Sequence, residues 1–197
     1  SFCRAMVEKV KKAFPHVIVV MNVGGIVDTK WFRDCDEIQS VLMAWQGGKE
    51  GGLATADILC GDVNPSGKLS DTYAKDLEDY PSTANFHESA FYVDYTEDIY
   101  VGYRYFETIP GAAERVNYPF GFGLSYTDFD WKMTDASEEN GVITVLTEVT
   151  NTGKTAGKEV IQLYYGAPQG KLGKPAKVLG HSKRPVFFSR VNVRFLP

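Results

Sequence analysis

The residues best placed to do chemistry in this sequence lie in a glycine-rich stretch, residues 46–67, which reads Q-G-G-K-E-G-G-L-A-T-A-D-I-L-C-G-D-V-N-P-S-G. Paired glycines allow a tight turn and a close approach of the backbone to a ligand, and Glu50 adds a carboxylate where a helix begins. A ligand could bind at that turn. The same spacing also suits glycines that only pack a strand against a helix, and spacing alone favours this second interpretation.

A polar segment, residues 68–98, contains a second candidate pair, His87 and Glu88. Helical periodicity fades in this segment, so a long loop is expected, and long loops in compact domains are often functional or connecting. The two side chains could act as an acid/base pair. Neighbouring residues in an extended segment point in opposite directions, however, so the pattern favours two solvated side chains.

Arg104 lies within a densely aromatic run, E-D-I-Y-V-G-Y-R-Y-F-E. Tyrosines and phenylalanines at this density suit an aromatic wall or an interdomain surface. We expect the guanidinium to stack on a ring or to pair with a nearby carboxylate, for which Glu97 and Asp98 are the candidates.

The cysteines and histidines show no spacing typical of a catalytic dyad or a metal site. Cys3, Cys35 and Cys60 are far apart in the chain, and we expect buried, reduced thiols, which would suit a reducing, cytoplasmic compartment. No metal or phosphate motif is visible, so the sequence predicts no cofactor.

Composition indicates a globular protein without a nucleic-acid partner. The chain has 197 residues, of which 44% are hydrophobic, and a formal net charge of −4. The apolar fraction is sufficient for a buried core. Nucleic-acid binding depends on clustered Lys and Arg, which this sequence lacks. The longest apolar run, residues 17–23, is too short to cross a bilayer, so no membrane partner is expected.

The elements that would position these residues begin with an α/β pattern. Residues 1–14 have the apolar spacing of an amphipathic helix, and Pro15 ends it. Residues 17–23 form a β-branched run typical of a parallel strand covered on both faces, and residues 38–45 form a second apolar run. A helix follows in the glycine-rich stretch. This order predicts a partial parallel α/β layer.

Both predicted strands should end at one rim of the sheet. Ligands of open parallel sheets gather at the carboxyl ends of strands, so residues 22–25 and 45–50 are expected to line one site. Trp45 could stack on a sugar there, although a large aromatic residue on an apolar strand is more often part of the core. Glu50 could face the same ligand or cap its helix. The candidate substrate-binding residues are therefore Trp45, Glu50, Glu97 and Arg104.

The last part of the chain changes to the two-residue period of β-strands. Phe129, Trp131 and Met133 alternate with polar residues, and similar runs follow. The pattern predicts a small antiparallel β-sandwich. The change of period divides the chain into an α/β part, residues 1–126, and an all-β part, residues 127–197.

Several motifs occur in order along residues 17–180: V-I-V-V-M-N-V-G-G, K-E-G-G, N-P-S-G-K-L, V-G-Y-R-Y-F and F-G-F-G-L-S-Y, followed by T-N-T-G and G-K-E-V-I-Q-L-Y. The first five resemble the non-barrel half of glycoside hydrolase family 3, the β-glucosidase family. The last two resemble that family's fibronectin type III-like domain. The resemblance therefore implies part of an α/β sandwich domain followed by a truncated fibronectin type III-like sandwich.

The resemblance also implies the chemistry of a retaining β-glycosidase, which needs two carboxyl groups about 5 Å apart, one as nucleophile and one as acid and then base. In that family the nucleophile is an Asp on a separate (β/α)8 barrel, and the acid/base Glu precedes the stretch that matches residues 17–25. Neither position occurs here, so no residue is assigned as catalytic. The implied role is a fragment that supplies scaffold and part of a cleft for a β-glucoside or oligosaccharide, with the missing barrel as its partner.

The resemblance ends abruptly after Gly180. The family usually continues with an aromatic-Lys-Lys/Arg-Thr strand and a Pro-Gly-Glu turn, whereas this sequence reads H-S-K-R-P-V-F-F. A shift of reading frame would explain the change. The hypothesis fails if the encoding DNA, read one base out of step, does not restore family-like sequence.

An alternative function is a non-catalytic carbohydrate-binding or protein-interaction module that uses the aromatic residues 100–105 or the sandwich. Binding of glucose or cello-oligosaccharides without hydrolysis would support it. We also expect self-association, because surface that would pack on the barrel should be apolar and exposed.

Overall fold

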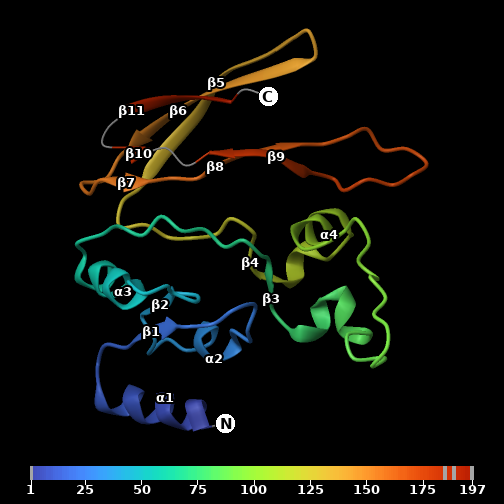
Figure 1. Ribbon diagram of the computed structural model, residues 1–197. Helices are drawn as coiled ribbons and strands as arrows, with labels where there is room; N and C mark the ends of the chain where they lie inside the picture. The colour runs from blue at the N-terminus through green and yellow to red at the C-terminus, as the bar shows by residue number, and fades with distance from the viewer. Residues whose placement is uncertain (1, 184–185, 188–189, 196–197) are drawn as a thin grey trace.

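The structure, a computed structural model, describes residues 2–183, 186–187 and 190–195 and changes character along the chain (Figure 1). Helices and two short parallel strands form the first part, and antiparallel strands form the second. The mixed α/β character expected for the first part is confirmed.

Helix α1 (Phe2–Ala13) packs against the parallel strands β1 (Ile18–Met21) and β2 (Ser40–Met43). The core between them contains Val17, Phe32 and Ile38, of which Phe32 comes from the short helix α2 (Lys30–Arg33); Val7, Val10, Val19 and Val41 pack around them. Apolar residues at helical spacing thus bury one stripe of α1, as predicted. The elements end one to two residues inside the predicted bounds.

The other face of this two-stranded sheet is open, so the prediction of a strand covered on both faces is wrong for the described chain. Side chains alternate across a strand, and while Val19 packs on α1, Ile18 and Val20 are 54% and 41% exposed. The β-branched run correctly indicated a parallel strand, but sequence alone does not show which elements cover it.

Helix α3 (Gly51–Cys60) follows the glycine-rich turn, as expected. It ends at Gly61, whose φ of 84° is the left-handed conformation that glycine adopts at helix ends and whose N–H bonds the Ile58 carbonyl. Cys60, the last residue of the helix, is exposed and Cys35 is half-buried, so the prediction of buried thiols is wrong for these two cysteines. The side chain of Cys3 lies outside the described part.

The expected long loop of residues 68–98 contains short regular elements, so that prediction is wrong for its first half. Strand β3 (Tyr73–Ala74) is followed by two 3-10 helices, η1 (Leu77–Asp79) and η2 (Pro81–Ala84). Asp76 and Asp79 close η1 by bonding each other's backbone N–H groups. Elements this short leave no periodicity that a sequence could reveal.

The aromatic run contains a helix that the sequence did not reveal. Helix α4 (Tyr103–Thr108) leads through η3 (Ala113–Arg115) to β4 (Val116–Tyr118), which pairs with β3 in an antiparallel manner. Phe106 of α4 is 2% exposed and packs with Ala74 and Ala112, which are also buried. The aromatic run thus forms a second small core.

The antiparallel strands after residue 126 confirm the predicted two-residue period. Val145, Val149 and Ile161 form their core, with Phe129 and Leu163 packed against it. One sheet has the order β11-β6-β5, and two further pairs are β8 with β9 and β7 with β10. The strands are β5 (Phe129–Glu139), β6 (Val142–Asn151), β7 (Gly157–Lys158), β8 (Ile161–Tyr165), β9 (Val178–Lys183), β10 (Val186–Phe187) and β11 (Arg190–Phe195).

Two apolar residues of the alternating pattern are exposed. Trp131 and Met133 on β5 are 68% and 60% exposed, although Val149, which pairs with Trp131, is fully buried. β5 is an edge strand, and its register shifts between Met133 and Asp135. Part of residues 181–197 lies outside the described residues, and the frame-shift hypothesis stays a prediction.

The turn that carries the N-P-S-G motif joins the two parts of the chain. Asn64 Oδ1 accepts hydrogen bonds from Ser125 Oγ (2.9 Å) and the Tyr126 N–H (2.8 Å), and its amide donates to the Ala156 carbonyl (3.0 Å). Lys68, in the same motif, pairs with Glu159 at 2.9 Å. The motif therefore has a clear structural role.

Candidate functional site

Residues 22–25 and 45–50 form one edge of the structure, which we call the strand-end rim. β1 and β2 are parallel and in register, so their carboxyl ends coincide, and the Ala44 N–H bonds the Met21 carbonyl at 3.0 Å. The two turns touch, because a Cβ atom added to Gly24 would lie 2.9 Å from the Gln46 side chain. The expectation that both turns line one rim is confirmed.

The structure of the rim requires glycine at position 47 but not at position 48. A Cβ atom added to Gly47 would lie 2.8 Å from Gly51 Cα, a contact that backbone atoms cannot tolerate. A Cβ atom added to Gly48 would meet nothing within 4 Å. The close approach of residue 47 to the first turn of α3 therefore explains one member of the paired glycines by packing.

Trp45 follows β2 in a conformation that is rare for a residue with a side chain. Its φ is 54°, in the left-handed region, and its side chain is half-buried. Backbone strain of this kind persists only where the surrounding structure imposes it, and it clusters at functional sites. Trp45 is thus neither a fully buried core residue nor a fully exposed platform.

Glu50 occupies the N-cap position of α3 but does not act as a cap. Its side chain is exposed and makes no capping hydrogen bond. The interpretation that it simply caps its helix is therefore wrong. The carboxylate lies at the positive end of the helix dipole, which favours a negative charge there.

The other two candidates lie near α4. Arg104 Cζ lies 5.8 Å from the centre of the Tyr103 ring, which confirms the predicted stacking. Glu97 accepts a hydrogen bond from Ser82 Oγ at 3.2 Å, and within the described residues no ion pair joins Arg104 to Glu97 or Asp98. Figure 1 shows α3 and α4 on opposite sides of the molecule. Arg104 of α4 is therefore separated from Trp45 and Glu50, which precede α3.

His87 and Glu88 are both exposed, as the solvated interpretation predicted. The His87 ring packs against Phe86 with a centroid distance of 4.5 Å.

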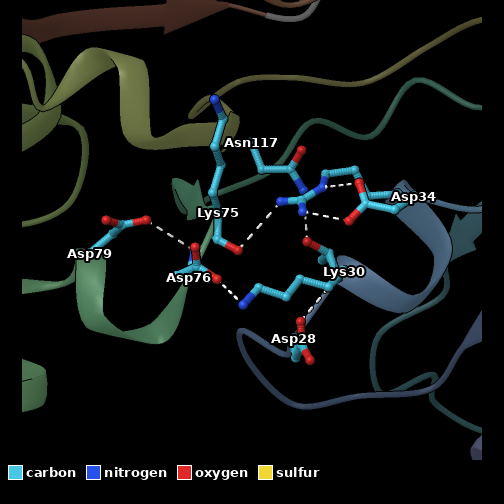
Figure 2. Close-up of polar contacts among 9 residues, drawn as sticks. Asp28, Lys30, Asp34, Lys75, Asp76, Asp79 and Asn117 are labelled. Atoms are coloured by element: carbon cyan, nitrogen blue, oxygen red, sulfur yellow. Dashed lines mark hydrogen bonds and ion pairs between the residues drawn. The ribbon is translucent and has the colours of Figure 1, made fainter.

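A polar network ties the loop that leaves the rim to the segment around β3 (Figure 2). Lys30 of α2 forms an ion pair with Asp76, and its backbone N–H donates to Asp28 Oδ1 at 2.9 Å. The pair with Asp76 raises the pKa of Lys30. Asn117 of β4 donates to Thr29 Oγ1 at 2.7 Å.

Arg33 completes this network at the end of α2. Its Nε and one terminal nitrogen each lie 2.7 Å from a carboxylate oxygen of Asp34, and its other terminal nitrogen donates to the Lys75 carbonyl at 3.4 Å (Figure 2). The bidentate bond from Arg33 lowers the pKa of Asp34, so this carboxylate stays charged in mild acid. The network ties α2 and the loop before it to β3 and β4, and its charged carboxylates are paired with Lys30 and Arg33.

Sequence reasoning missed this network because its members are separated along the chain and belong to short elements. The charged residues show no helical or alternating spacing that would have linked residues 28–34 to residues 75–79. The missed contact between Gly24 and Gln46 has the same origin, since only the register of β1 and β2 brings them together.

Neither a metal-ligand cluster nor a membrane-spanning helix occurs in the part of the chain that the structure describes. Among the described residues, no three His, Cys, Asp or Glu side chains gather as they would around a metal ion. No helix in the described part is both long enough and apolar enough to span a membrane.

Comparison with known proteins identifies the class to which this fold and rim belong. Residues 2–126 match the glycosyl hydrolase family 3 C-terminal domain. The chain therefore belongs to glycosyl hydrolase family 3.

Individual relatives are β-glucosidases. The chain is 66% identical to beta-glucosidase A of Butyrivibrio fibrisolvens over 192 residues, a match that covers 90% of this chain and 23% of the relative. It is 47% identical to a beta-glucosidase of Ruminococcus albus, with coverage of 89% and 18%. The chain thus spans about a fifth of the length of these curated relatives.

Solved structures show the same likeness in three dimensions. A beta-glucosidase from Paenibacillus barengoltzii matches with a TM-score of 0.91 and 48% identity, over 98% of this chain and 22% of that protein. The beta-glucosidase of Kluyveromyces marxianus in complex with glucose matches with a TM-score of 0.86 and 37% identity, over 98% and 23%.

Proposed function

We propose that this chain acts as part of a family 3 β-glucosidase that hydrolyses β-glucosides or oligosaccharides with retention of configuration. The observation that carries the proposal is the 66% identity to a β-glucosidase across nine tenths of the chain. Identity at this level along the whole match favours the enzyme over a free-standing binding module.

Within such an enzyme, the proposed role of the chain is to provide scaffold and one wall of the cleft. Retaining hydrolysis needs a nucleophilic carboxylate and a second carboxyl group as acid and base. We assign neither to this chain and propose that other segments, including a (β/α)8 barrel, supply them. The isolated chain is expected to lack turnover, because it would lack both covalent and acid/base catalysis.

Trp45 and Glu50 are the proposed substrate contacts of the strand-end rim. An indole can pack on the apolar face of a sugar ring, and a free carboxylate can accept hydrogen bonds from its hydroxyl groups. The strained backbone of Trp45 and the uncapped carboxylate of Glu50 support this assignment. Glu97 and Arg104 are proposed as contacts of a separate aromatic wall around α4, which lies opposite α3 in Figure 1.

We further propose that the chain comprises two units, residues 1–126 and residues 127–197. The second unit would be a fibronectin type III-like sandwich. The antiparallel strands from β5 onward and their own core of Val145, Val149 and Ile161 support this division.

A chimeric enzyme tests the function. The matching region of the Butyrivibrio beta-glucosidase A is replaced by this chain, and hydrolysis of an aryl β-glucoside is measured beside the isolated chain. We expect turnover from the chimera and none from the isolated chain above a denatured control. Turnover by the isolated chain, after removal of host enzymes, would contradict the proposal that other segments supply the catalytic carboxyl groups. An inactive but folded chimera would contradict the proposed role in a β-glucosidase.

The rim assignment is tested in the same chimera. Trp45→Ala should lower kcat/KM about tenfold or more, since loss of a large apolar contact buried against the substrate costs about 1.5–3 kcal/mol. Trp131→Ala, which removes an indole of the exposed edge strand, is the matched control and should leave kcat/KM unchanged. Equal effects of the two substitutions would remove Trp45 from the site.

Self-association of the isolated chain is also proposed. Large apolar side chains such as Phe91 (97% exposed), Leu172 (89%) and Leu124 (76%) lie on the surface. Exposed apolar surface of this kind promotes association. Light scattering over a range of concentrations should show mass increasing with concentration, and a constant monomer mass would contradict the proposal.

A further inference from the structure

A pocket of about 330 Å³ lies where the two parts of the chain meet, between α4, β4 and β8. We call it the seam pocket. Its walls include Tyr103 and Glu107 of α4, Phe120 after β4, Tyr164 of β8 and Lys177 just before β9. The volume is at the lower end of the range of about 300–1,000 Å³ that is usual for small-molecule sites. It suits one sugar-sized ring rather than a chain of several.

The aromatic side of the seam pocket is held rigidly. The Tyr103 ring lies 4.9 Å from the Phe120 ring and 5.7 Å from the Tyr164 ring, measured between centroids. The Tyr103 hydroxyl accepts a hydrogen bond from the Leu179 N–H at 2.8 Å, and the Tyr164 hydroxyl donates to Gln162 Oε1 at 2.9 Å. Because both tyrosines are fixed at their tips, the pocket is shaped before any ligand arrives.

The polar side of the seam pocket is an ion pair that remains within reach of solvent. Lys177 Nζ lies 2.9 Å from Glu107 Oε1, and each side chain is 40% exposed. The ammonium also lies 5.2 Å from the centre of the Tyr164 ring. A carboxylate can accept about four hydrogen bonds, so this pair leaves acceptor capacity on Glu107 and donor capacity on Lys177.

The pocket lining has no net charge, which argues against a charged ligand. Glu107 and Lys177 are the charged residues of the lining, so a ligand with a net charge would meet no uncompensated partner. The deep wall adds Thr72, which is 2% exposed and whose Oγ1 has no hydrogen-bond partner in the part of the chain that the structure describes. Flat apolar rings beside a paired donor and acceptor match a neutral molecule with one apolar face and several hydroxyl groups.

We propose that the seam pocket is an accessory site for a single neutral saccharide unit, in addition to the enzymatic role and separate from the strand-end rim. Glu107 would accept hydrogen bonds from neighbouring hydroxyl groups of the sugar, Lys177 would donate to a ring or hydroxyl oxygen, and the aromatic side would contact the C–H face. The lining shares no residue with the rim. Occupation of the pocket would hold α4 against β8 and so stabilise the junction of the two parts.

The proposal is tested by titrating the isotope-labelled 197-residue chain with D-glucose and following its amide resonances. Saturable shifts are expected at residues of α4 and β8. Glu107→Gln should weaken binding about tenfold, because it removes a charge-assisted hydrogen bond. Glu114→Gln is the matched control, since Glu114 is an exposed carboxylate on η3 outside the lining, and it should leave the affinity unchanged. Thermal unfolding of both variants verifies that they are folded.

Sorbitol provides the test of ligand class. It carries the hydroxyl groups of a sugar but no flat ring face, and it should bind at least several-fold more weakly than glucose. No saturable shift at the highest soluble glucose concentration, equal binding of sorbitol, or an affinity that Glu107→Gln leaves unchanged would each overturn the proposal. The glucose titration does not depend on hydrolysis, so its outcome is independent of the outcome of the chimera experiment.

Discussion

The strand-end rim and the region around α4 are built in opposite ways. We call this region, which comprises α4, the buried residues packed around it and the seam pocket, the seam. The rim depends on backbone geometry: Gly47 lies against α3, Trp45 is held at a left-handed φ, and one face of the sheet behind it is open at Ile18 and Val20. The seam depends on buried side chains, with Phe106 2% exposed and Ala112 fully buried. The difference indicates that buried side chains stabilise the seam, whereas the backbone of two turns defines the rim.

The largest expected effect tests whether buried side chains stabilise the seam. Phe106→Ala should lower the free energy of unfolding by about 3–5 kcal/mol, because it leaves a cavity beside Ala74 and Ala112. Val20→Ala, on the open face of the rim's sheet, should cost less than about 1 kcal/mol. Urea denaturation of the two variants gives both values, and similar losses would contradict the comparison.

A second pair of variants tests the rim itself. Gly47→Ala should cost about 1–3 kcal/mol, because its Cβ would lie 2.8 Å from Gly51 Cα and would displace the first turn of α3. Gly48→Ala, with no atom within 4 Å of the new Cβ, should change stability by less than about 0.5 kcal/mol. In the chimera, only the first substitution should lower kcat/KM. Equal effects of the two substitutions on stability and on kcat/KM would show that the rim does not depend on the close approach of Gly47 to Gly51.

A third pair separates hydrogen bonding from packing in the seam. The Tyr80 hydroxyl donates to the Thr72 carbonyl (3.0 Å) and accepts from the Ala74 N–H (2.7 Å). Tyr80→Phe keeps the ring and should lower stability by about 1–3 kcal/mol, since two partly buried backbone groups lose their partner. Tyr95→Phe is the control, because Tyr95 is 90% exposed. A loss no greater than that of the control would mean that the ring alone secures β3.

The smallest effect appears only in alkali. Burial raises the pKa of Tyr73, Tyr80, Tyr118 and Tyr164 above 10.0. Above pH 10 the unfolded chain therefore holds fewer protons than the folded chain, and stability falls as the pH rises from about 10 through the raised values. Urea midpoints at increasing pH, read beside phenolate absorbance, should show this loss, and Tyr164→Phe should reduce its slope. A constant midpoint above pH 10 would contradict the burial of these phenols.

Much of the α/β part could be predicted because its signals are local. The apolar spacing of α1, the β-branched run of β1 and the glycines around α3 each identify one element, and parallel pairing of β1 and β2 follows from their order. The shared rim followed in turn from that pairing. Helix α4 could not be predicted, since six residues rich in tyrosine show too little periodicity.

The candidate site was predictable in part. Placing Trp45 and Glu50 on one rim needed only the strand order, whereas their separation from Arg104 depends on how α4 packs on β3 and β4. The seam pocket was beyond prediction for the same reason. Its walls come from residues 72 to 177, and no periodicity links positions so far apart.

By itself, the sequence determined the family, the change from a mixed to an antiparallel pattern, and the turns at which a ligand could bind, because each is encoded in neighbouring residues. Only the tertiary structure decided which face of the β1–β2 sheet stays open, that Glu50 leaves its helix uncapped, and that Glu107 meets Lys177 beside Tyr164. These outcomes depend on contacts between segments that are distant in the sequence. The energy of each contact depends on both elements, so no single stretch of the chain can reveal it.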